Sequence, residues 1–135
     1  FVIAMAISRV AGDNLTMRYG PIVMLTVGVG LMLASLLVMV LVPFAYASFA
    51  ALFVMGLGIA NVAPILISAA SRTSGMDSVK TITVVTTVGY GGLLAGPALI
   101  GAVSSLISLP GAFVMECGLL VLGLLLIRGN KKVFD

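Results

Sequence analysis

Few side chains in this sequence could take part in chemistry, because only 8% of its 135 residues are charged. Glu116 is the one acid inside a long apolar run, which covers residues 110–127. A carboxylate in such a setting costs about 2.5–3.5 kcal/mol on membrane-insertion scales, so it is a functional candidate by default. Two interpretations stay open. Glu116 could carry a proton, or it could form a structural hydrogen bond to a neighbouring helix.

Uncharged polar side chains gather on two other apolar runs at helical spacing. On the run 45–71, four residues fall within about 80° of one another around a helix, namely Asn61, Pro64, Ser68 and Ser71. On the run 81–107 a second face carries Thr83, Thr86, Thr87 and Tyr90. These amide and hydroxyl groups could bind a small polar ligand, or they could join helices through hydrogen bonds of about 0.6 kcal/mol each.

The opposite face of the run 81–107 carries Gly89, Gly92 and Gly96. Gly92 and Gly96 form a GxxxG pair, which allows two helix backbones to approach closely. Pro97 follows directly and removes one hydrogen bond of the helix. We therefore expect this face to pack against another helix.

The apolar runs themselves predict the fold class. Hydrophobic residues make up 61% of the chain, whereas a soluble domain has about a quarter charged residues. A membrane-spanning helix needs about 20 mostly apolar residues, and four runs reach that length: 21–42, 45–71, 81–107 and 110–127. The prediction is an all-α, polytopic transmembrane helical bundle. We expect the nearly featureless run 21–42 to contact lipid.

The basic residues predict an orientation. All seven fall in alternate gaps or in the tail: Arg9, Arg18, Arg72, Lys80, Arg128, Lys131 and Lys132. Alternate gaps lie on the same side of a membrane, and Lys and Arg favour the cytoplasmic side. We therefore expect loops 9–20 and 72–80 and the C-terminus to be cytoplasmic, in the cell (inner) membrane. Residues 1–8 are too short to span, and we expect them to be the end of a truncated span.

The sequence gives little support to a nucleic-acid-binding protein, a metalloprotein or an enzyme. The basic residues are spread over short loops with few aromatic residues, which does not indicate nucleic-acid binding. The sequence has no histidine and a single cysteine, so the common metal-ligand constellations are absent and we expect no metal and no cofactor. No nucleotide-binding loop is present, and the sequence does not indicate an enzyme. Membrane lipids are the expected surroundings.

Three stretches resemble the major facilitator superfamily of transporters. Residues 12–20, GDNLTMRYG, are similar to its cytoplasmic loop motif, and residues 89–101, GYGGLLAGPALIG, to its Gly-Pro helix motif. Residues 56–72, GLGIANVAPILISAASR, look like helix 10 of fucose-permease-like members. The order of the motifs places the chain at the end of helix 8 through helix 12, the C-terminal part of such a transporter.

The resemblance implies roles for particular residues. Gly12, Asp13, Arg18 and Gly20 would form the conformational loop, in which Asp13 and Arg18 could latch one access state. Asn61, Thr83, Thr87 and Tyr90 would line the substrate cavity. Gly89, Gly92, Gly96 and Pro97 would pack helices, and Glu116 would be structural rather than proton-coupling.

The implied function is secondary active transport of a small, sugar-like or other polar solute by alternating access. The partners would be the substrate, a coupling proton or ion, and the N-terminal half of the same transporter. Two alternatives stay open, a non-transporting membrane scaffold subunit and a truncated, inactive transporter fragment. The sequence does not identify the substrate or the coupling ion.

Overall fold

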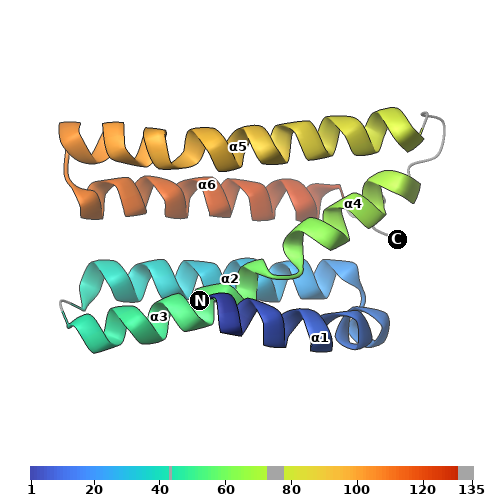
Figure 1. The fold of residues 1–135 in the computed structure, drawn as a ribbon, viewed down its shortest axis with the longest axis horizontal. Coiled ribbons are helices and arrows are strands. Elements are labelled where there is room, and N and C mark those ends of the chain that lie inside the picture. Colours follow the sequence, from blue (N-terminus) through green and yellow to red (C-terminus); the bar gives the residue numbers. More distant parts are fainter. Residues whose placement is uncertain (43, 73–77, 131–135) are drawn as a thin grey trace.

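A computed structural model describes residues 1–42, 44–72 and 78–130. These residues form six helices (Figure 1), which are α1 (Val2–Tyr19), α2 (Pro21–Leu41), α3 (Ala45–Ile59), α4 (Val62–Arg72), α5 (Ser78–Leu106) and α6 (Leu109–Gly129). The helices α5 and α6 form one antiparallel pair. A second group contains α1, α2 and α3, and α4 leads from this group towards the start of α5.

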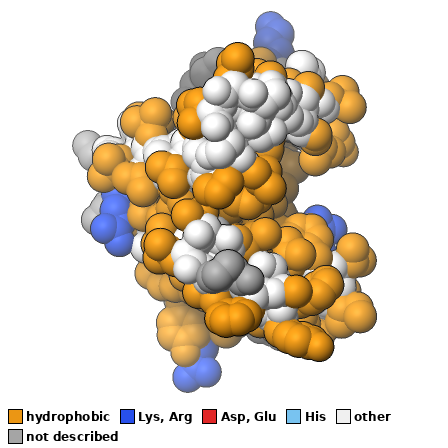
Figure 2. All heavy atoms as spheres, turned by 90° about the vertical axis from the view of Figure 1, so that its left-hand side faces the viewer, with side chains coloured by type: hydrophobic (Ala, Val, Ile, Leu, Met, Phe, Trp, Pro, Cys, Tyr) orange, Lys and Arg blue, Asp and Glu red, His pale blue; other side chains and the backbone are white. Residues whose placement is uncertain are grey.

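Four helical segments are long and apolar enough to cross a membrane: Pro21–Leu41, Ala45–Arg72, Val79–Leu106 and Leu109–Gly129. They match the four predicted spans to within a few residues. The described part of the chain is therefore all-helical, with four segments that can cross a membrane. Consistent with this, the face seen in Figure 2 is covered mainly by hydrophobic side chains, and large exposed side chains such as Tyr46 and Leu94 are apolar or aromatic.

The predicted loop 9–20 is wrong, because α1 stays helical to Tyr19 and only Gly20 separates it from α2. Charge was taken as a sign of a loop, but residues 9–19 contain no proline, and charged side chains do not prevent a helix. Gly20 makes the turn at φ 84° and ψ 156°, a region that essentially only glycine occupies. Pro21 then begins α2, where its missing N–H costs nothing.

The predicted loop 72–80 is shorter than expected. Helix α4 ends at Arg72 and α5 begins at Ser78, so Lys80 lies in the first turn of α5. Residues 73–77 lie outside the described residues. Helix α5 also continues through Pro97 without a break.

Most of the described basic residues gather at one end of the bundle, as the alternating gaps predict. Arg18, Arg72 and Arg128 lie in the last turns of α1, α4 and α6, and these helix ends share one side of Figure 1 with the start of α5. Arg9 is the exception, because it lies inside α1, about 15 Å from the end of that helix. Lys131 and Lys132 fall outside the described residues.

Helix α2 forms the centre of the chain rather than a lipid-facing surface alone. Leu25, Val29, Met32 and Leu36 recur every three or four residues and are buried. A third of the apolar window of α2 is buried, compared with none of the corresponding window of α5. The expectation that the run 21–42 mainly contacts lipid is therefore wrong for one face of α2.

Close helix contacts are made by glycines other than the predicted ones. A Cβ atom on Gly28 would lie 2.6 Å from the carbonyl oxygen of Gly58, and a Cβ on Gly58 would lie 2.5 Å from that of Gly28. The backbones of α2 and α3 thus touch at a reciprocal glycine pair, a contact that a larger residue would prevent. In the same way, a Cβ atom on Gly56 would lie 2.6 Å from the carbonyl oxygen of Phe1.

The predicted packing stripe on α5 has no such contact within the described chain. A Cβ on Gly89, Gly92 or Gly96 would meet nothing within 4 Å. The predicted packing role of these three glycines and Pro97 stays a prediction, since no helix among the described residues covers them.

The Gly28–Gly58 pair gives a direct test of the packing. Gly28→Leu should destabilise the protein by about 1–3 kcal/mol, because the new side chain overlaps the backbone of α3, which cannot move easily. The measurement is the thermal unfolding midpoint of the detergent-solubilised protein. Gly30→Leu is the matched control, since Gly30 lies on the same helix and faces open space. Equal midpoints for the two variants would contradict the α2–α3 contact.

Candidate functional site

The span Ala45–Arg72 is broken near its middle, which creates the candidate site. Helix α3 ends at Ile59, and α4 begins at Val62. Pro64 lies in the first turn of α4 and lacks the N–H that would bond to the carbonyl of Ala60 in a continuous helix. Asn61 and Pro64 of the predicted polar face thus lie at or next to the break. Because water is scarce inside a bilayer, backbone groups freed at such a break need partners from neighbouring helices.

Ser8 of α1 supplies a partner at the break. Its hydroxyl donates a hydrogen bond to the carbonyl oxygen of Leu57, at 2.9 Å, in the last turn of α3. The Asn61 side-chain Nδ2 donates to the hydroxyl of Ser8 at 3.0 Å and to the Ser8 carbonyl at 3.2 Å. We call these three bonds the Ser8–Asn61 bridge. It joins α1 to the last turn of α3 and to Asn61 within the break.

Gly12 lets the bridge form. It lies one turn after Ser8 on the same face of α1 and is buried. A Cβ on Gly12 would overlap the Asn61 side chain, with the Asn61 Cγ only 2.5 Å away. Gly12 is therefore a close-contact residue inside the fold, whereas the sequence predicted a place in an exposed loop.

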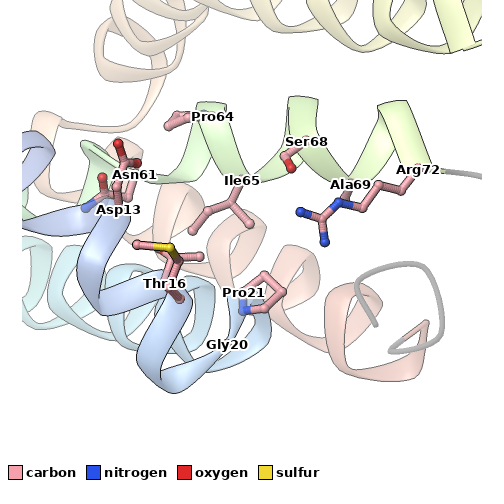
Figure 3. A pocket seen from close by; sticks show the side chains of 11 residues that line it. Asp13, Thr16, Gly20, Pro21, Asn61, Pro64, Ile65, Ser68, Ala69 and Arg72 are labelled. Carbon is pink, nitrogen blue, oxygen red and sulfur yellow. The ribbon is translucent and has the colours of Figure 1, made fainter.

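A cavity of about 650 Å³ lies next to the break, between α1, the start of α2 and α4 (Figure 3). Most of its lining is apolar. Its polar side chains come from α1, from the break between α3 and α4, and from α4. Asp13 and Asn61 lie at one end and Arg72 at the other. The full lining is Asp13, Thr16, Met17, Gly20, Pro21, Asn61, Pro64, Ile65, Ser68, Ala69 and Arg72.

The cavity combines groups of opposite charge with neutral donors and acceptors. Asp13 offers a carboxylate, Arg72 a guanidinium, and Asn61 an amide that is only 8% exposed. The hydroxyl groups of Thr16 and Ser68 stand between them along the lining. Such a set can hold a small polar molecule by hydrogen bonds while the apolar walls exclude water. Among the described residues, no cluster of His, Cys, Asp or Glu could hold a metal ion.

The structure brings together two groups of predicted residues that the sequence kept apart. Asp13 and Gly20 of the predicted loop motif line the same cavity as Asn61 of the predicted substrate site. Arg18 lies outside it, with its guanidinium carbon 5.6 Å from the centre of the Tyr19 ring. No ion pair joins Arg9 to Asp13 in the part of the chain that the structure describes.

The other predicted residues lie away from the cavity. Thr83, Thr87 and Tyr90 are exposed on α5, and the Thr83 hydroxyl donates to the Val79 carbonyl of its own helix at 2.7 Å. Glu116 is half-buried on α6 and lines neither cavity of the described chain. No hydrogen bond links Glu116 to another described residue.

Ser8 is one functional candidate that sequence reasoning missed, and Arg72 of the cavity is another. Ser8 was taken only as the end of an apolar stretch. The available signal was its spacing, since Ser8 and Gly12 are four residues apart and therefore share a helix face. That signal becomes visible only when residues 9–19 are read as helix.

Comparison with known proteins supports the membrane assignment. The chain is 34% identical over 113 residues to an uncharacterized MFS-type transporter of Yersinia pestis, a match that covers 84% of this chain and 29% of the relative. It is 28% identical over 123 residues to the membrane protein MosC of Rhizobium meliloti, covering 90% of this chain and 30% of the relative. No family model matches the chain, and no solved structure matches it.

The chain is a partial homologue of an MFS-type transporter. It spans about 30% of the length of the curated relatives that it matches. The similarity agrees with the four candidate spans of the described residues, which make this an all-helical, multi-pass membrane chain.

The Ser8–Asn61 bridge can be tested by mutation. Asn61→Ala and Ser8→Ala should each destabilise the protein by about 1–3 kcal/mol, because a buried polar partner is left unsatisfied. The double variant should lose clearly less free energy of unfolding than the two single variants together, since both substitutions remove the same hydrogen bonds. The measurement is again the unfolding midpoint in detergent.

The control for this cycle is Ser104→Ala, whose hydroxyl bonds only to the Gly101 carbonyl within α5. That change should alter stability by less than about 0.5 kcal/mol. Strictly additive effects of the Ser8 and Asn61 substitutions would show that the bridge does not exist.

Proposed function

We propose that this chain is part of a secondary active transporter that moves small polar solutes by alternating access. One observation carries the proposal, namely a cavity with charged and polar side chains at its ends, beside a broken helix in an otherwise apolar bundle. In secondary transporters, discontinuous helices near the membrane midplane form substrate and ion sites, and Asn61 lies near the middle of its span. The similarity to an MFS-type transporter supports the same function.

Within this proposal, the cavity residues bind the solute. Asn61 and Ser68 would hydrogen-bond to hydroxyl groups of a sugar-like molecule, and Asp13 and Arg72 would orient it at the two ends. Thr83, Thr87 and Tyr90 would extend the polar lining when further helices of the same transporter face α5. The fucose-permease-like branch is the finer proposal, and it rests on the resemblance of residues 56–72.

The orientation follows from the basic residues. We propose that the end of the bundle with Arg18, Arg72, Lys80 and Arg128 faces the cytoplasm of a cell (inner) membrane, because Lys and Arg are enriched on that side. The cavity reaches this end at Gly20 and Arg72, so in the proposed transporter it would be accessible from the cytoplasmic side. Asp13 and Arg18 would then help to hold one access state.

Two further roles complete the proposal. The glycine stripe Gly89, Gly92 and Gly96, together with Pro97, would pack against the N-terminal half of the transporter. Glu116 would be structural rather than proton-coupling, because it lies on α6 away from both cavities. The coupling proton or ion would bind elsewhere.

The transport function is tested by uptake into cells that produce the full-length protein. A panel of radiolabelled small sugars and polyols should contain at least one solute that accumulates only with an energised membrane. Asn61→Ala should lower the rate of that uptake at least tenfold at equal amounts of protein in the membrane. The reason is that removal of the buried amide leaves a hydroxyl group of the bound solute without its hydrogen-bond partner.

Asn14→Ala serves as the control, since Asn14 is exposed on α1 and does not line the cavity. This variant should transport normally. Uptake by Asn61→Ala equal to that of Asn14→Ala would exclude Asn61 from the substrate site. Absence of energised uptake across the whole panel would contradict transport of small polyhydroxy solutes.

A further inference from the structure

A second cavity, which shares only Asn61 with the first, forms a groove between α1 and α2. Its volume is about 530 Å³, and we call it the α1–α2 groove. Ile7, Ala11 and Leu15 of α1 form one wall, Val23 and Val27 of α2 form the other, and Leu57 and Gly58 of α3 form the floor. The lining is mostly apolar, which fits a hydrocarbon ligand better than a polar solute.

The dimensions of the groove match one leaflet of a bilayer. Along α1 it extends from Ile7 to Tyr19, which is about 18 Å at the helical rise per residue. The hydrocarbon core of one leaflet is about 15 Å thick, half of the bilayer value. The deep end of the groove reaches Ser8 and Asn61, and Tyr19 lies at its other end, next to the basic end of the bundle.

Positive charge stands at the Tyr19 end. Arg18 follows Leu15 by three residues and so lies on the same helix face as Ala11 and Leu15. It does not line the groove itself, but its guanidinium carbon lies 5.6 Å from the centre of the Tyr19 ring, which does. No acidic side chain lines the groove, since Asp13 belongs to the other cavity.

We propose that the α1–α2 groove binds an anionic phospholipid, with one acyl chain along the groove and the phosphate at Arg18. Charge complementarity at the mouth selects the headgroup, and the apolar walls take the chain. The exposed apolar side chains around it, such as Val10 and Val27, place the groove against lipid. Only the choice of leaflet rests on the proposed orientation, in which the lipid lies in the cytoplasmic leaflet.

The site would have a structural consequence. Ser8 and Asn61 line the inner end of the groove and also carry the bridge that holds the helix break. A bound acyl chain would therefore cover the bridge and exclude water from it on the lipid side. Polar solute and lipid would occupy opposite sides of α1.

The headgroup preference is tested with the full-length protein, delipidated in detergent and titrated with phosphatidylglycerol or phosphatidylcholine under native mass spectrometry. Phosphatidylglycerol should bind more tightly than phosphatidylcholine. Arg18→Gln should weaken phosphatidylglycerol binding about fivefold, the factor that corresponds to the contribution of one basic residue near an anionic surface. Arg128→Gln should have no effect, because Arg128 lies in the last turn of α6, a helix that contributes no residue to the groove. Equal binding of the two lipids, or no effect of Arg18→Gln, would overturn the proposal.

The position of the acyl chain is tested by photo-crosslinking in native membranes. A benzophenone amino acid in place of Val27 should capture phospholipid, and Ala11→Phe should abolish that capture by filling the groove. Val10→Phe is the matched control, since Val10 is 82% exposed and does not line the groove. Capture of another polypeptide segment instead of lipid would show that a helix occupies the groove, and the proposal would fall whether or not the protein transports sugars.

Discussion

The hydrogen bonds that join Asn61 to Ser8 are the interaction on which the rest of this chain depends. A break in a membrane-spanning helix exposes backbone polar groups, and each unsatisfied group in hydrocarbon costs several kcal/mol. The Ser8 hydroxyl satisfies the Leu57 carbonyl, and the Asn61 amide fixes that hydroxyl in place. With the break stabilised, α4 can diverge from α3, which leaves a polar cavity on one side of α1 and an apolar groove on the other.

The sequence predicted the spans well because their physical cause is local. A run of about 20 apolar residues is sufficient to specify a spanning helix. The polar face with Asn61 and Pro64 was recognised, but the position of the break was not predicted. The prediction of a loop at residues 9–20 was wrong for an equally physical reason. Arg9, Asp13 and Arg18 are compatible with a helix whose end leaves the membrane, so charge alone could not distinguish that helix from a loop.

Contacts between helices were beyond the reach of the sequence, because the spacing of glycines does not identify their partner. The predicted stripe at Gly92 and Gly96 has a familiar spacing but contacts no described helix, whereas Gly28 and Gly58 meet without any motif. Asn61 was selected for its polarity, and its partner Ser8 is 53 positions away in the sequence. The chain spans about 30% of its curated relatives, and we propose that the open face of α5 packs against the remainder of such a transporter.

Access of water to the cavity from the cytoplasm tests the central claim most directly. In the full-length protein with Cys117→Ser, cysteines would be introduced singly as Thr16→Cys, Ser68→Cys and Leu122→Cys. An impermeant thiol reagent should label the first two in inside-out vesicles and not in right-side-out vesicles. Leu122, exposed on α6 within a span, should be labelled in neither. Labelling of Thr16→Cys and Ser68→Cys only from the outside, or in neither preparation, would contradict a polar cavity that opens to the cytoplasm beside the broken helix.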